Sequence, residues 1–379
     1  MKGIECIELR KFITEYKQKN EKNEFKPVAV GKYGIRTRES IYSKELAKDY
    51  SKNKIIFKNT LTVGMGSRQI DIGILTDDVI YSVSPAYHTY KISGINADYL
   101  RYCLMCRNED MFKRFVKRGS RQGKSIDLKR WLEYEIPVYD VCNQEKIVLK
   151  LNKVTNVISM RKQQLQKLDE LIQARFVEMF GDPITNSKLL PIEKIEERYF
   201  LKAGITTKAE DIHDYLKDKY EIPCYGGNGI RGYVENLSYE GCYPIIGRQG
   251  ALCGNVQYAT GKFHATEHAV LVSTLKNDNT MWVYYMLKLM DLYRYHTGAA
   301  QPGLAVKKLN TIDVIVADIN LQNQFAAFVH QINKSKFVIH KFLYCTTHNT
   351  KSIIKPRPNT KESGKIRGRE TTCRRILTF

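Results

Sequence analysis

The sequence has no long apolar run and no apolar leader. None of its uninterrupted apolar stretches approaches the length of ~18 residues that a membrane-spanning helix needs. The first residues, Met1-Lys-Gly-Ile-Glu-Cys6, lack the apolar core of a signal peptide. The nine cysteines are scattered, and only Cys103 and Cys106 lie close together. An odd, unpatterned set of this kind predicts reduced thiols in the cytoplasm.

Motifs of several enzyme classes are also missing. The chain has no Gly-x-x-x-x-Gly-Lys-Ser/Thr loop for ATP. It has no Pro-Pro pair, so the Asn/Asp-Pro-Pro-Tyr/Phe motif expected of an adenine methyltransferase is absent. Glu24-Phe-Lys26 matches half of a nuclease motif, but no Asp precedes it to complete a metal site. These absences disfavour a self-contained enzyme, and we assign no catalytic residue, metal or cofactor to this chain.

Two short motifs could suggest a metal site. His264-Ala-Thr-Glu-His268 fits the His-x-x-Glu-His zinc pattern, which needs both histidines on one face of a helix. Its flanks predict a loop and a strand, so we expect a polar turn that enters a buried strand. Cys103 and Cys106 lack a second pair at zinc spacing and lie in a predicted helix, so buried packing is their expected role.

Basic residues are in large excess. Sixty-one Lys and Arg against forty Asp and Glu give a net charge of +21. The segment 341–379 contributes +8, so the rest of the chain retains +13 (21 minus 8). With 24 tyrosines, this balance favours a polyanionic partner, most simply nucleic acid. A solvated basic surface without such a partner is the alternative.

The segment 144–180 predicts one long amphipathic helix. Its apolar residues recur at alternating steps of three and four, the pattern of a helix that packs along a partner helix. They are Ile147, Leu151, Val154, Ile158, Leu165, Leu168, Ile172 and Met179, with Arg161 and Arg175 at the missing positions. Gly181-Asp-Pro183 ends the helix, which would be roughly 55 Å long. The simpler alternative is an amphipathic helix that lies on a single globular core.

The segments before and after this helix share one order of motifs. Strands are expected at 54–57, 61–63, 79–83, 243–246, 269–273 and 311–316, helices at 96–115 and 280–292, and a basic loop at 117–124. The matched pairs are Gly66–Gln69 with Gly247–Gln249, Tyr99–Leu104 with Trp282–Leu287, Gly119 and Gln122 with Gly298 and Gln301, Glu135–Val138 with Asp313–Val316, and Gln144–Ile147 with Gln322–Phe325. Because their offsets all lie between 178 and 183 residues, we predict a tandem duplication.

The duplication predicts an α+β fold with two similar mixed α/β domains and two long helices. The second helix would run through Phe325, Phe328, Val329, Ile332 and Val338. The predicted boundaries are 1–142 for the first domain, 143–183 for the central helix, 184–319 for the second domain, 320–344 for the second helix and 345–379 for a basic, disordered or altered tail.

The tail departs from the repeat because the apolar pattern weakens after Phe342, and Pro356 and Pro358 exclude a helix there. One hypothesis is that a shifted reading frame or a recombination junction produced this end. The absence of a homologous helix-coding frame in the downstream DNA would contradict it.

On this duplicated plan, the chain closely resembles the specificity subunit of bacterial type I restriction-modification enzymes. Short motifs carry the likeness, which covers about residues 1–342 and is stronger in the second half. They are Tyr225-Gly-Gly-Asn-Gly-Ile-Arg-Gly-Tyr233, Ile246-Gly-Arg-Gln-Gly250, Gly298-Ala-Ala-Gln-Pro-Gly-Leu304, Leu321-Gln-Asn-Gln-Phe325 and Phe176-Val-Glu-Met-Phe-Gly-Asp-Pro183. The residues 341–379 do not match, which leaves the length of the second helix open.

The resemblance implies two target-recognition domains separated by two antiparallel coiled-coil helices. Each domain would recognise half of a bipartite duplex DNA site, and the helix length would set the gap, about 16 base pairs for roughly 55 Å. Methyltransferase and restriction subunits would be the protein partners. The complex would be an adenine-N6 DNA methyltransferase and an ATP-dependent endonuclease, with S-adenosylmethionine, ATP and Mg in those partners and none in this chain.

Polar loops at matched positions hold the candidate DNA-binding residues. In the first domain these are Arg36, Arg38, Arg68, Gln69, Arg121, Gln122 and Lys124, and in the second Asn228, Arg231, Arg248, Gln249, Gln301 and Lys307. Arg can bond guanine bidentately and Asn or Gln adenine, whereas Lys more often meets phosphate. Gln122 and Gln301 could instead serve a shared loop architecture, because the two domains should recognise different sequences. Gly227, Gly229 and Gly250 are expected turn residues.

Two rival functions follow from the same residues. A self-contained restriction or methylation enzyme would need the motifs that are missing. A coiled-coil scaffold that recognises no DNA sequence would need only the helices. Duplex binding that falls steeply with salt would distinguish the DNA-binding subunit from the scaffold.

Overall fold

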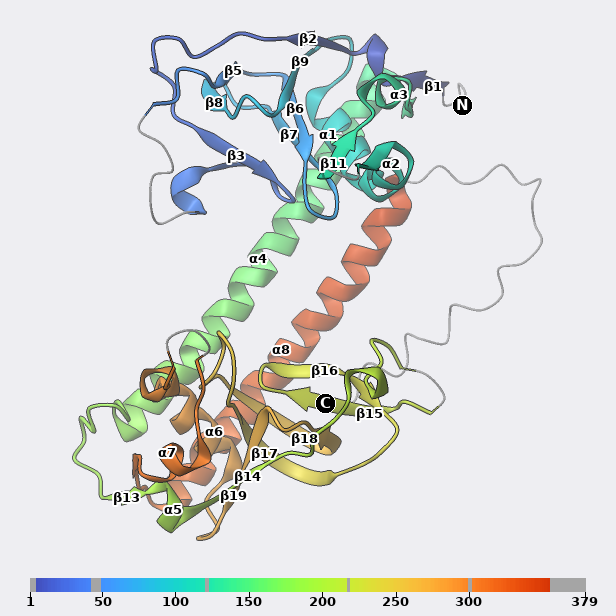
Figure 1. The fold of residues 1–379 in the computed structure, drawn as a ribbon. Coiled ribbons are helices and arrows are strands. Elements are labelled where there is room, and N and C mark those ends of the chain that lie inside the picture. The colour runs from blue at the N-terminus through green and yellow to red at the C-terminus, as the bar shows by residue number, and fades with distance from the viewer. Residues whose placement is uncertain (1–4, 42–48, 120–122, 217–218, 299–301, 355–379) are drawn as a thin grey trace. The chain divides into compact units, whose positions relative to one another are not determined.

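The computed structural model describes residues 5–41, 49–119, 123–216, 219–298 and 302–354 (Figure 1). These residues form two compact units. Unit 1 contains the described residues of Met1–Met160 and Phe342–Gly364, and unit 2 those of Arg161–Lys341. The helices α4 (Val141–Phe180) and α8 (Ile319–Ile354) each contribute to both units. Within the described residues, no helix is both long and apolar enough to cross a membrane.

Unit 1 is built on an antiparallel sheet with the strand order β2-β9-β6-β7. The strands β6 and β7 are rich in apolar residues and are buried over most of their length, as expected of packed strands. Trp131 and one face of α1 complete the core. The elements before α4 are β1 (Glu5–Glu8), η1 (Leu9–Lys11), β2 (Ile13–Tyr16), β3 (Val28–Gly31), β4 (Gly34–Thr37), η2 (Arg38–Ser40), β5 (Lys54–Ile56), β6 (Thr60–Met65), β7 (Ile70–Leu75), β8 (Tyr81–Val83), β9 (His88–Ile92), α1 (Ala97–Cys106), α2 (Asn108–Phe115), β10 (Val116–Gly119), β11 (Gly123–Ile126), α3 (Leu128–Leu132) and β12 (Glu135–Val138).

Unit 2 is built on a six-stranded sheet with the order β14-β19-β17-β18-β15-β16. All of its strand pairs are antiparallel except β15 with β18. The elements between the long helices are β13 (Ile192–Lys194), α5 (Ile195–Arg198), β14 (Tyr199–Ala203), η3 (Ala209–Asp211), β15 (Ile222–Gly226), β16 (Gly229–Val234), β17 (Tyr239–Gly247), β18 (Val256–Ala265), β19 (Ala269–Thr274), α6 (Thr280–Leu289), η4 (Leu292–Tyr295), α7 (Val306–Asn310) and β20 (Asp313–Ile315).

The two units repeat one plan, which confirms the predicted duplication and fold class. The order β2-β9-β6-β7 in unit 1 corresponds to β14-β19-β17-β18 in unit 2. In each unit the first strand pairs with the last: β1 with β12, and β13 with β20. The capped helices α1 and α6 also correspond, with Asn96 and Asn279 as N-caps. Between the first two core strands, each unit inserts a hairpin, β3–β4 or β15–β16.

The long helices pack antiparallel within unit 2. Asp169 of α4 pairs with Lys336 of α8 at 2.5 Å. Further along α4, Phe176 and Phe180 contact Phe325, which lies earlier in α8. Phe176 and Phe180 also contact the ring of Trp282, so both helices join the core of unit 2. Each fully buried aromatic side chain of this kind stabilises the fold by roughly 1.5–3 kcal/mol.

The predicted apolar face of the helices is partly buried along its whole length. Leu151, Ile172, Phe325 and Val329 are buried, and Ile147, Val154, Ile158, Leu165, Leu168 and Ile332 are half-buried. The assignment of Val338 to this face was wrong, because its side chain is 65% exposed. The neighbouring Ile339 is buried instead, since steps of three and four from Ile332 reach residue 339.

Helix α8 also extends beyond the end predicted at residue 344. It continues to Ile354, and Leu343 and Thr346 are half-buried at the same spacing that buries Ile339. Residues 345–354 contain no Pro or Gly, so nothing in the backbone forces the helix to stop where the large apolar residues become sparse. Residues 355–379 lie outside the described part of the chain.

Two local predictions in unit 1 need correction. The helix predicted over 96–115 is interrupted at Arg107, whose φ of −104° and ψ of 5° end α1 before α2 begins. The loop predicted over 117–124 includes a hairpin, in which β10 pairs with β11. A backbone ladder needs no apolar side chains, so the basic composition of this segment did not reveal it.

Candidate nucleic-acid interface

The turn between β6 and β7 presents Arg68 and Gln69 in unit 1. The backbone N–H of Gly66 donates to the carbonyl of Gln69 at 3.0 Å and closes the turn. Arg68 is exposed, whereas Gln69 is half-buried, with its amide 3.4 Å from an oxygen of Asp71. Burial raises the pKa of Asp71, and the hydrogen bond from Gln69 opposes that rise.

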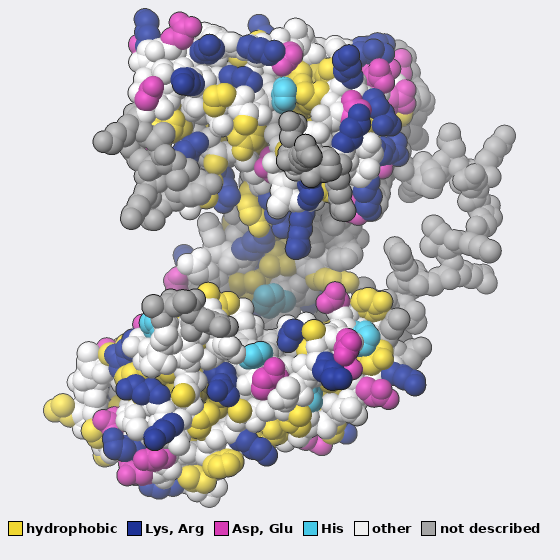
Figure 2. Space-filling view, in the orientation of Figure 1, with side chains coloured by type: hydrophobic (Ala, Val, Ile, Leu, Met, Phe, Trp, Pro, Cys, Tyr) yellow, Lys and Arg dark blue, Asp and Glu magenta, His cyan; other side chains and the backbone are white. Residues whose placement is uncertain are grey.

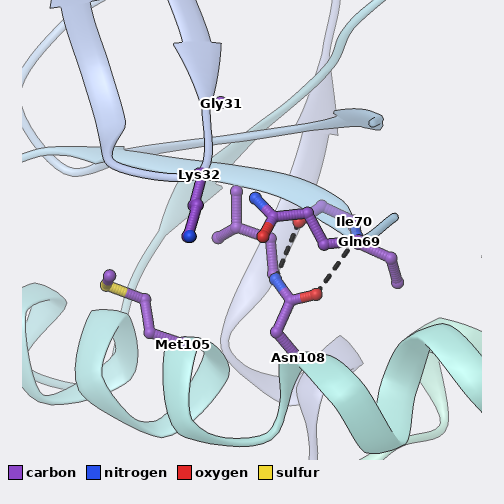
Figure 3. A pocket seen from close by; sticks show the side chains of 7 residues that line it. Gly31, Lys32, Gln69, Ile70, Met105 and Asn108 are labelled. Atoms are coloured by element: carbon purple, nitrogen blue, oxygen red, sulfur yellow. Dashed lines mark hydrogen bonds between the residues drawn. The ribbon is translucent and has the colours of Figure 1, made fainter. Parts of the chain in front are cut away.

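Asn108 holds this turn from the first residue of α2. Its side chain accepts a hydrogen bond from the Ile70 N–H at 3.1 Å and donates to the Ile70 carbonyl at 2.7 Å. These hydrogen bonds lie beside a small pocket of about 60 Å³. The pocket is lined by Gly31, Lys32, Gln69, Ile70, Ile72, Met105 and Asn108. In Figure 3, the side chains of Lys32 and Gln69 approach the pocket from the turns of two different hairpins, β3–β4 and β6–β7. The pocket therefore joins the 66–69 turn to the β3–β4 hairpin.

The tip of the β3–β4 hairpin carries an aromatic ring with two cations close to it. The Tyr33 side chain is 66% exposed. Lys32 Nζ lies 5.6 Å and Arg36 Cζ 5.3 Å from its ring centroid. An exposed ring beside cations suits contact with nucleic acid, because it can pack on sugars or bases while the cations meet phosphate. Arg38, in η2, packs over the Tyr50 ring at 5.4 Å.

The β10–β11 hairpin places Lys124 beside the same turn. Lys124 Nζ donates to the carbonyl of Ser67 at 2.5 Å and lies 5.6 Å from the Phe112 ring centroid. Lys124 thus supports the turn that presents Arg68 and Gln69. The candidates Arg121 and Gln122 lie outside the described residues.

In unit 2, three segments meet at the backbone of Arg248. Its N–H donates to the His268 carbonyl at 3.0 Å, and its carbonyl accepts from the Leu304 N–H at 2.8 Å. The turn at Gly227 forms the third side, because a Cβ on Gly247 would lie only 2.0 Å from the Gly227 carbonyl oxygen. Only glycine fits at 247 without moving this turn. The half-exposed Arg248 side chain is therefore presented from a backbone held on several sides.

The other candidates of unit 2 lie on these segments or next to them. Asn228 is exposed and accepts a hydrogen bond from Asn255 at 2.5 Å, whereas Gln249 is exposed on a strand-like bridge to Gly303. Arg231 is exposed on β16, and Lys307 is exposed in α7. Gly229 and Gly250 have φ of +96° and +85°, which confirms them as turn residues. Gln301 lies outside the described residues.

The His264–His268 segment is not a helix: His264 lies near the end of β18, and residues 266–268 form the predicted polar turn into β19. The loop predicted on its N-terminal flank was wrong, because residues 261–263 belong to β18. His264 is buried, and both of its ring nitrogens are engaged by hydroxyls: Nε2 by Thr207 at 2.8 Å and Nδ1 by Ser238. Burial lowers the pKa of His264, although the charge of Glu267 opposes this. Among the described residues, no group of three or more His, Cys, Asp or Glu is arranged to hold a metal ion. Cys103 is buried in α1, as predicted, whereas Cys106 at the end of the same helix is only partly buried.

Figure 2 shows Lys and Arg side chains spread over the visible face of each unit, with Asp and Glu between them. The candidate surface of unit 1 combines the 66–69 turn, the β3–β4 hairpin and Lys124. The candidate surface of unit 2 combines Asn228, Arg248 and Gln249. Sequence reasoning missed Asn108, whose partner is 38 positions away, and did not predict Lys32 and Tyr33 as DNA-binding residues. The pairing of Tyr33 with two nearby cations was the signal that could have included them.

Comparison with protein families matches residues 7–170 and 201–343 to the type I restriction modification DNA specificity domain. The chain belongs to this family. The two matched segments fall on the two copies of the duplicated plan, so the resemblance inferred from short motifs is confirmed.

Curated relatives and solved structures agree with this family. The EcoprrI type I restriction enzyme specificity subunit of Escherichia coli is 40% identical over 176 residues, which cover 46% of this chain and 42% of the relative. A putative type I specificity subunit of Haemophilus influenzae is 28% identical over 126 residues, or 32% of this chain and 33% of the relative. Each match thus spans less than half of the relative.

The S subunit structure from M. genitalium has a TM-score of 0.55 at 16% identity, covering 95% of this chain and 98% of that one. A chain from a structure on complex assembly and conformational transition of the type I R-M system has a TM-score of 0.53 at 12% identity, covering 93% and 97%. At these identities the likeness shows the shared fold.

Proposed function

We propose that this chain is the DNA specificity subunit of a type I restriction-modification system. Each unit would act as a target-recognition domain for one half of a bipartite duplex site. The observation that carries the proposal is that the family match falls on both copies of a duplicated fold. In each copy, the loop after the matched strand, β6 or β17, presents an Arg-Gln pair: Arg68-Gln69 and Arg248-Gln249.

The chemistry of these surfaces supports base recognition. Arg68 and Arg248 are suited to guanine and the adjoining glutamines to adenine, whereas Lys307 is suited to phosphate. The net charge of +21 supplies attraction to any duplex. The backbone hydrogen bonds at Arg248 and the Asn108 contacts to Ile70 hold both loops before DNA arrives, which reduces the entropy lost on binding.

Catalysis belongs to the partners in this proposal. Methyltransferase subunits, with S-adenosylmethionine, would transfer a methyl group to adenine at sites that this chain selects. Restriction subunits, with ATP and Mg, would translocate and cleave DNA. The complex would act in the bacterial cytoplasm.

A filter-binding titration tests the DNA-binding part. The full chain, alone and with its methyltransferase subunits, should bind duplex DNA with an affinity that falls with salt at a slope of about −0.9 per phosphate contacted. Lys307→Ala should reduce that slope by about 1 and weaken all sequences equally. Indifference to DNA in both states would contradict the proposal and favour a scaffold.

A methyl-transfer assay tests the division of labour. The lone chain should transfer no methyl group from labelled S-adenosylmethionine, and the complex with methyltransferase subunits should methylate adenine at defined sites. Robust transfer by the lone chain would overturn the assignment of catalysis to the partners. Mapping methylated adenines in host DNA would identify the recognised bases and the gap.

A further inference from the structure

Each long helix carries a buried glutamine as its fourth residue. Gln144 in α4 is 2% exposed, and Gln322 in α8 is 0% exposed. Glutamine is rarely buried to this extent, because its amide loses hydrogen bonds to water that the protein must replace. The two residues occupy equivalent places in the duplicated plan, one in each unit.

The two glutamines make the same pair of hydrogen bonds. The Oε1 of Gln144 accepts from the Asn96 N–H at 2.9 Å, and that of Gln322 accepts from the Asn279 N–H at 2.8 Å. The Nε2 of Gln144 donates to the Tyr139 carbonyl at 2.7 Å, and that of Gln322 donates to the Ala317 carbonyl at 3.0 Å. In each buried amide, therefore, the oxygen accepts a hydrogen bond and the nitrogen donates one.

These bonds join the start of a long helix to the start of a core helix. Asn96 caps α1 by accepting from the Tyr99 N–H at 3.0 Å, and Asn279 caps α6 by accepting from the Met281 N–H at 3.0 Å. Tyr139 and Ala317 lie just before α4 and α8. In each unit, one glutamine side chain of the long helix is therefore hydrogen-bonded both to the segment that follows the last strand, β12 or β20, and to the N-cap of the core helix, α1 or α6.

Apolar contacts alone would restrain the helix less. Val148 and Leu151 of α4 are buried, but apolar packing is non-directional and tolerates small rotations of a helix about its axis. Hydrogen bonds weaken steeply when their angles change. Two bonds in different directions from one side chain therefore restrain both the tilt and the rotation of the first helical turn.

We propose that Gln144 and Gln322 are positioning residues that fix the direction in which each long helix leaves its recognition domain, and thereby the gap at which two half-sites are accepted. The inference rests on the proposed function. It assigns gap discrimination to this pair of residues and leaves base discrimination to the loop residues described above.

The test uses the full chain in complex with its methyltransferase subunits. Once mapping of methylated adenines has identified the native gap, duplexes are made with that gap and with gaps one base pair shorter and longer. Methyl transfer is measured for wild type, for Gln144→Leu, which keeps the approximate shape without the hydrogen bonds, and for the control Gln163→Leu on the exposed face of the same helix.

Gln144→Leu should reduce the preference for the native gap by about tenfold, less than the full effect of its two lost hydrogen bonds, because the apolar contacts of the helix still restrain it in part. It should leave discrimination against single-base changes in either half-site at the wild-type level, and Gln163→Leu should change neither. If Gln144→Leu does not fold, Gln144→Met serves, because its unbranched side chain has nearly the length of glutamine and lacks the amide that bonds Asn96 and Tyr139.

Wild-type gap preference in a folded Gln144 variant would overturn the inference. So would a uniform loss of methylation at all gaps, since that is the signature of a merely structural role. Failure of the wild-type complex to methylate any defined site would instead overturn the proposed function, and this inference with it, before a variant is compared.

Discussion

The two units fill two equivalent positions with side chains of opposite character: unit 2 has a buried ion pair there, and unit 1 has apolar side chains. In unit 2, Arg198 and Asp278 form a buried bidentate pair with both N–O distances at 2.6 Å. In unit 1 the equivalent positions are held by Phe12, which is buried in the apolar core, and by Ile95, which is partly buried and packs against that core. Phe12 and Arg198 are equivalent because the Ser93 N–H donates to the Phe12 carbonyl and the Leu275 N–H to the Arg198 carbonyl, each at 2.9 Å. Ile95 and Asp278 are equivalent because each directly precedes the N-cap asparagine of its core helix.

The ion pair of unit 2 is connected to the glutamine of its long helix. Gln322 Nε2 also donates to Asp278 at 2.7 Å, whereas Gln144 has no carboxylate at the equivalent place, Ile95. Burial lowers the pKa of Arg198, but the hydrogen bonds and charge of Asp278 outweigh this and raise it overall. Both units thus keep the buried glutamine, whereas the positions beside it hold a charged pair in unit 2 and apolar side chains in unit 1.

Asp278→Ala should have the largest effect, because it leaves Arg198 buried without its main partner. We expect the free energy of unfolding of unit 2 to fall by about 3 kcal/mol, near the lower end for a broken buried pair. Glu193, 3.3 Å from Arg198, still offers a second carboxylate. Amide hydrogen exchange of the full chain measures this, with unit 1 peptides as the internal control. Equal loss of protection in both units would contradict a local effect.

Arg68→Ala and Arg248→Ala form a matched pair on the two recognition surfaces. Each should relax discrimination by about 1–3 kcal/mol in its own half-site and leave the other unchanged. Binding to duplexes with single-base changes in each half-site measures this. Equal weakening of both half-sites by Arg248→Ala would make Arg248 a phosphate contact or a folding residue.

Acid should destabilise unit 2 through His264. Burial lowers the pKa of His264 below 6.5, so just below pH 6.5 the unfolded state binds more protons than the folded state. The stability that neutral His264 contributes is therefore present above about pH 6.5 and is lost as the pH falls below that value. Hydrogen exchange of β18 and β19 between pH 7.5 and 5.5, referenced to intrinsic rates, measures it. In His264→Gln the acid-dependent part of this loss should be smaller. An unchanged pH dependence would exclude His264 as its source.

Replacing both Arg198 and Asp278 should change the free energy of unfolding of unit 2 least. Arg198→Phe combined with Asp278→Ile gives unit 2 the side chains of unit 1, and we expect stability within about 1.5 kcal/mol of wild type. The same hydrogen-exchange measurement compares this variant with Asp278→Ala. A double variant as unstable as the single one would show that unit 2 depends on the charges themselves.

Sequence reasoning succeeded where the signal was local or repeated. Steps of three and four predicted α4, and motifs at offsets of 178–183 residues predicted the duplicated fold. It placed Gln144 and Gln322 in the repeat but not in a role, because their partners Asn96 and Asn279 are 48 and 43 positions away. It missed the end of α8 because a helix can continue on polar residues once its earlier turns are packed.

The sequence by itself determined the composition, the long helices, the two copies of the plan and the family, because periodicity and repetition act over neighbouring residues or a constant offset. Only the tertiary structure decided which side chains meet. Arg198 and Asp278 lie 80 positions apart, and nothing in either neighbourhood marks the other as its partner. The same holds for Asn108 at the recognition turn and for Gly227 against Gly247. These contacts depend on strand order and register, which bring distant residues together only after the chain has folded.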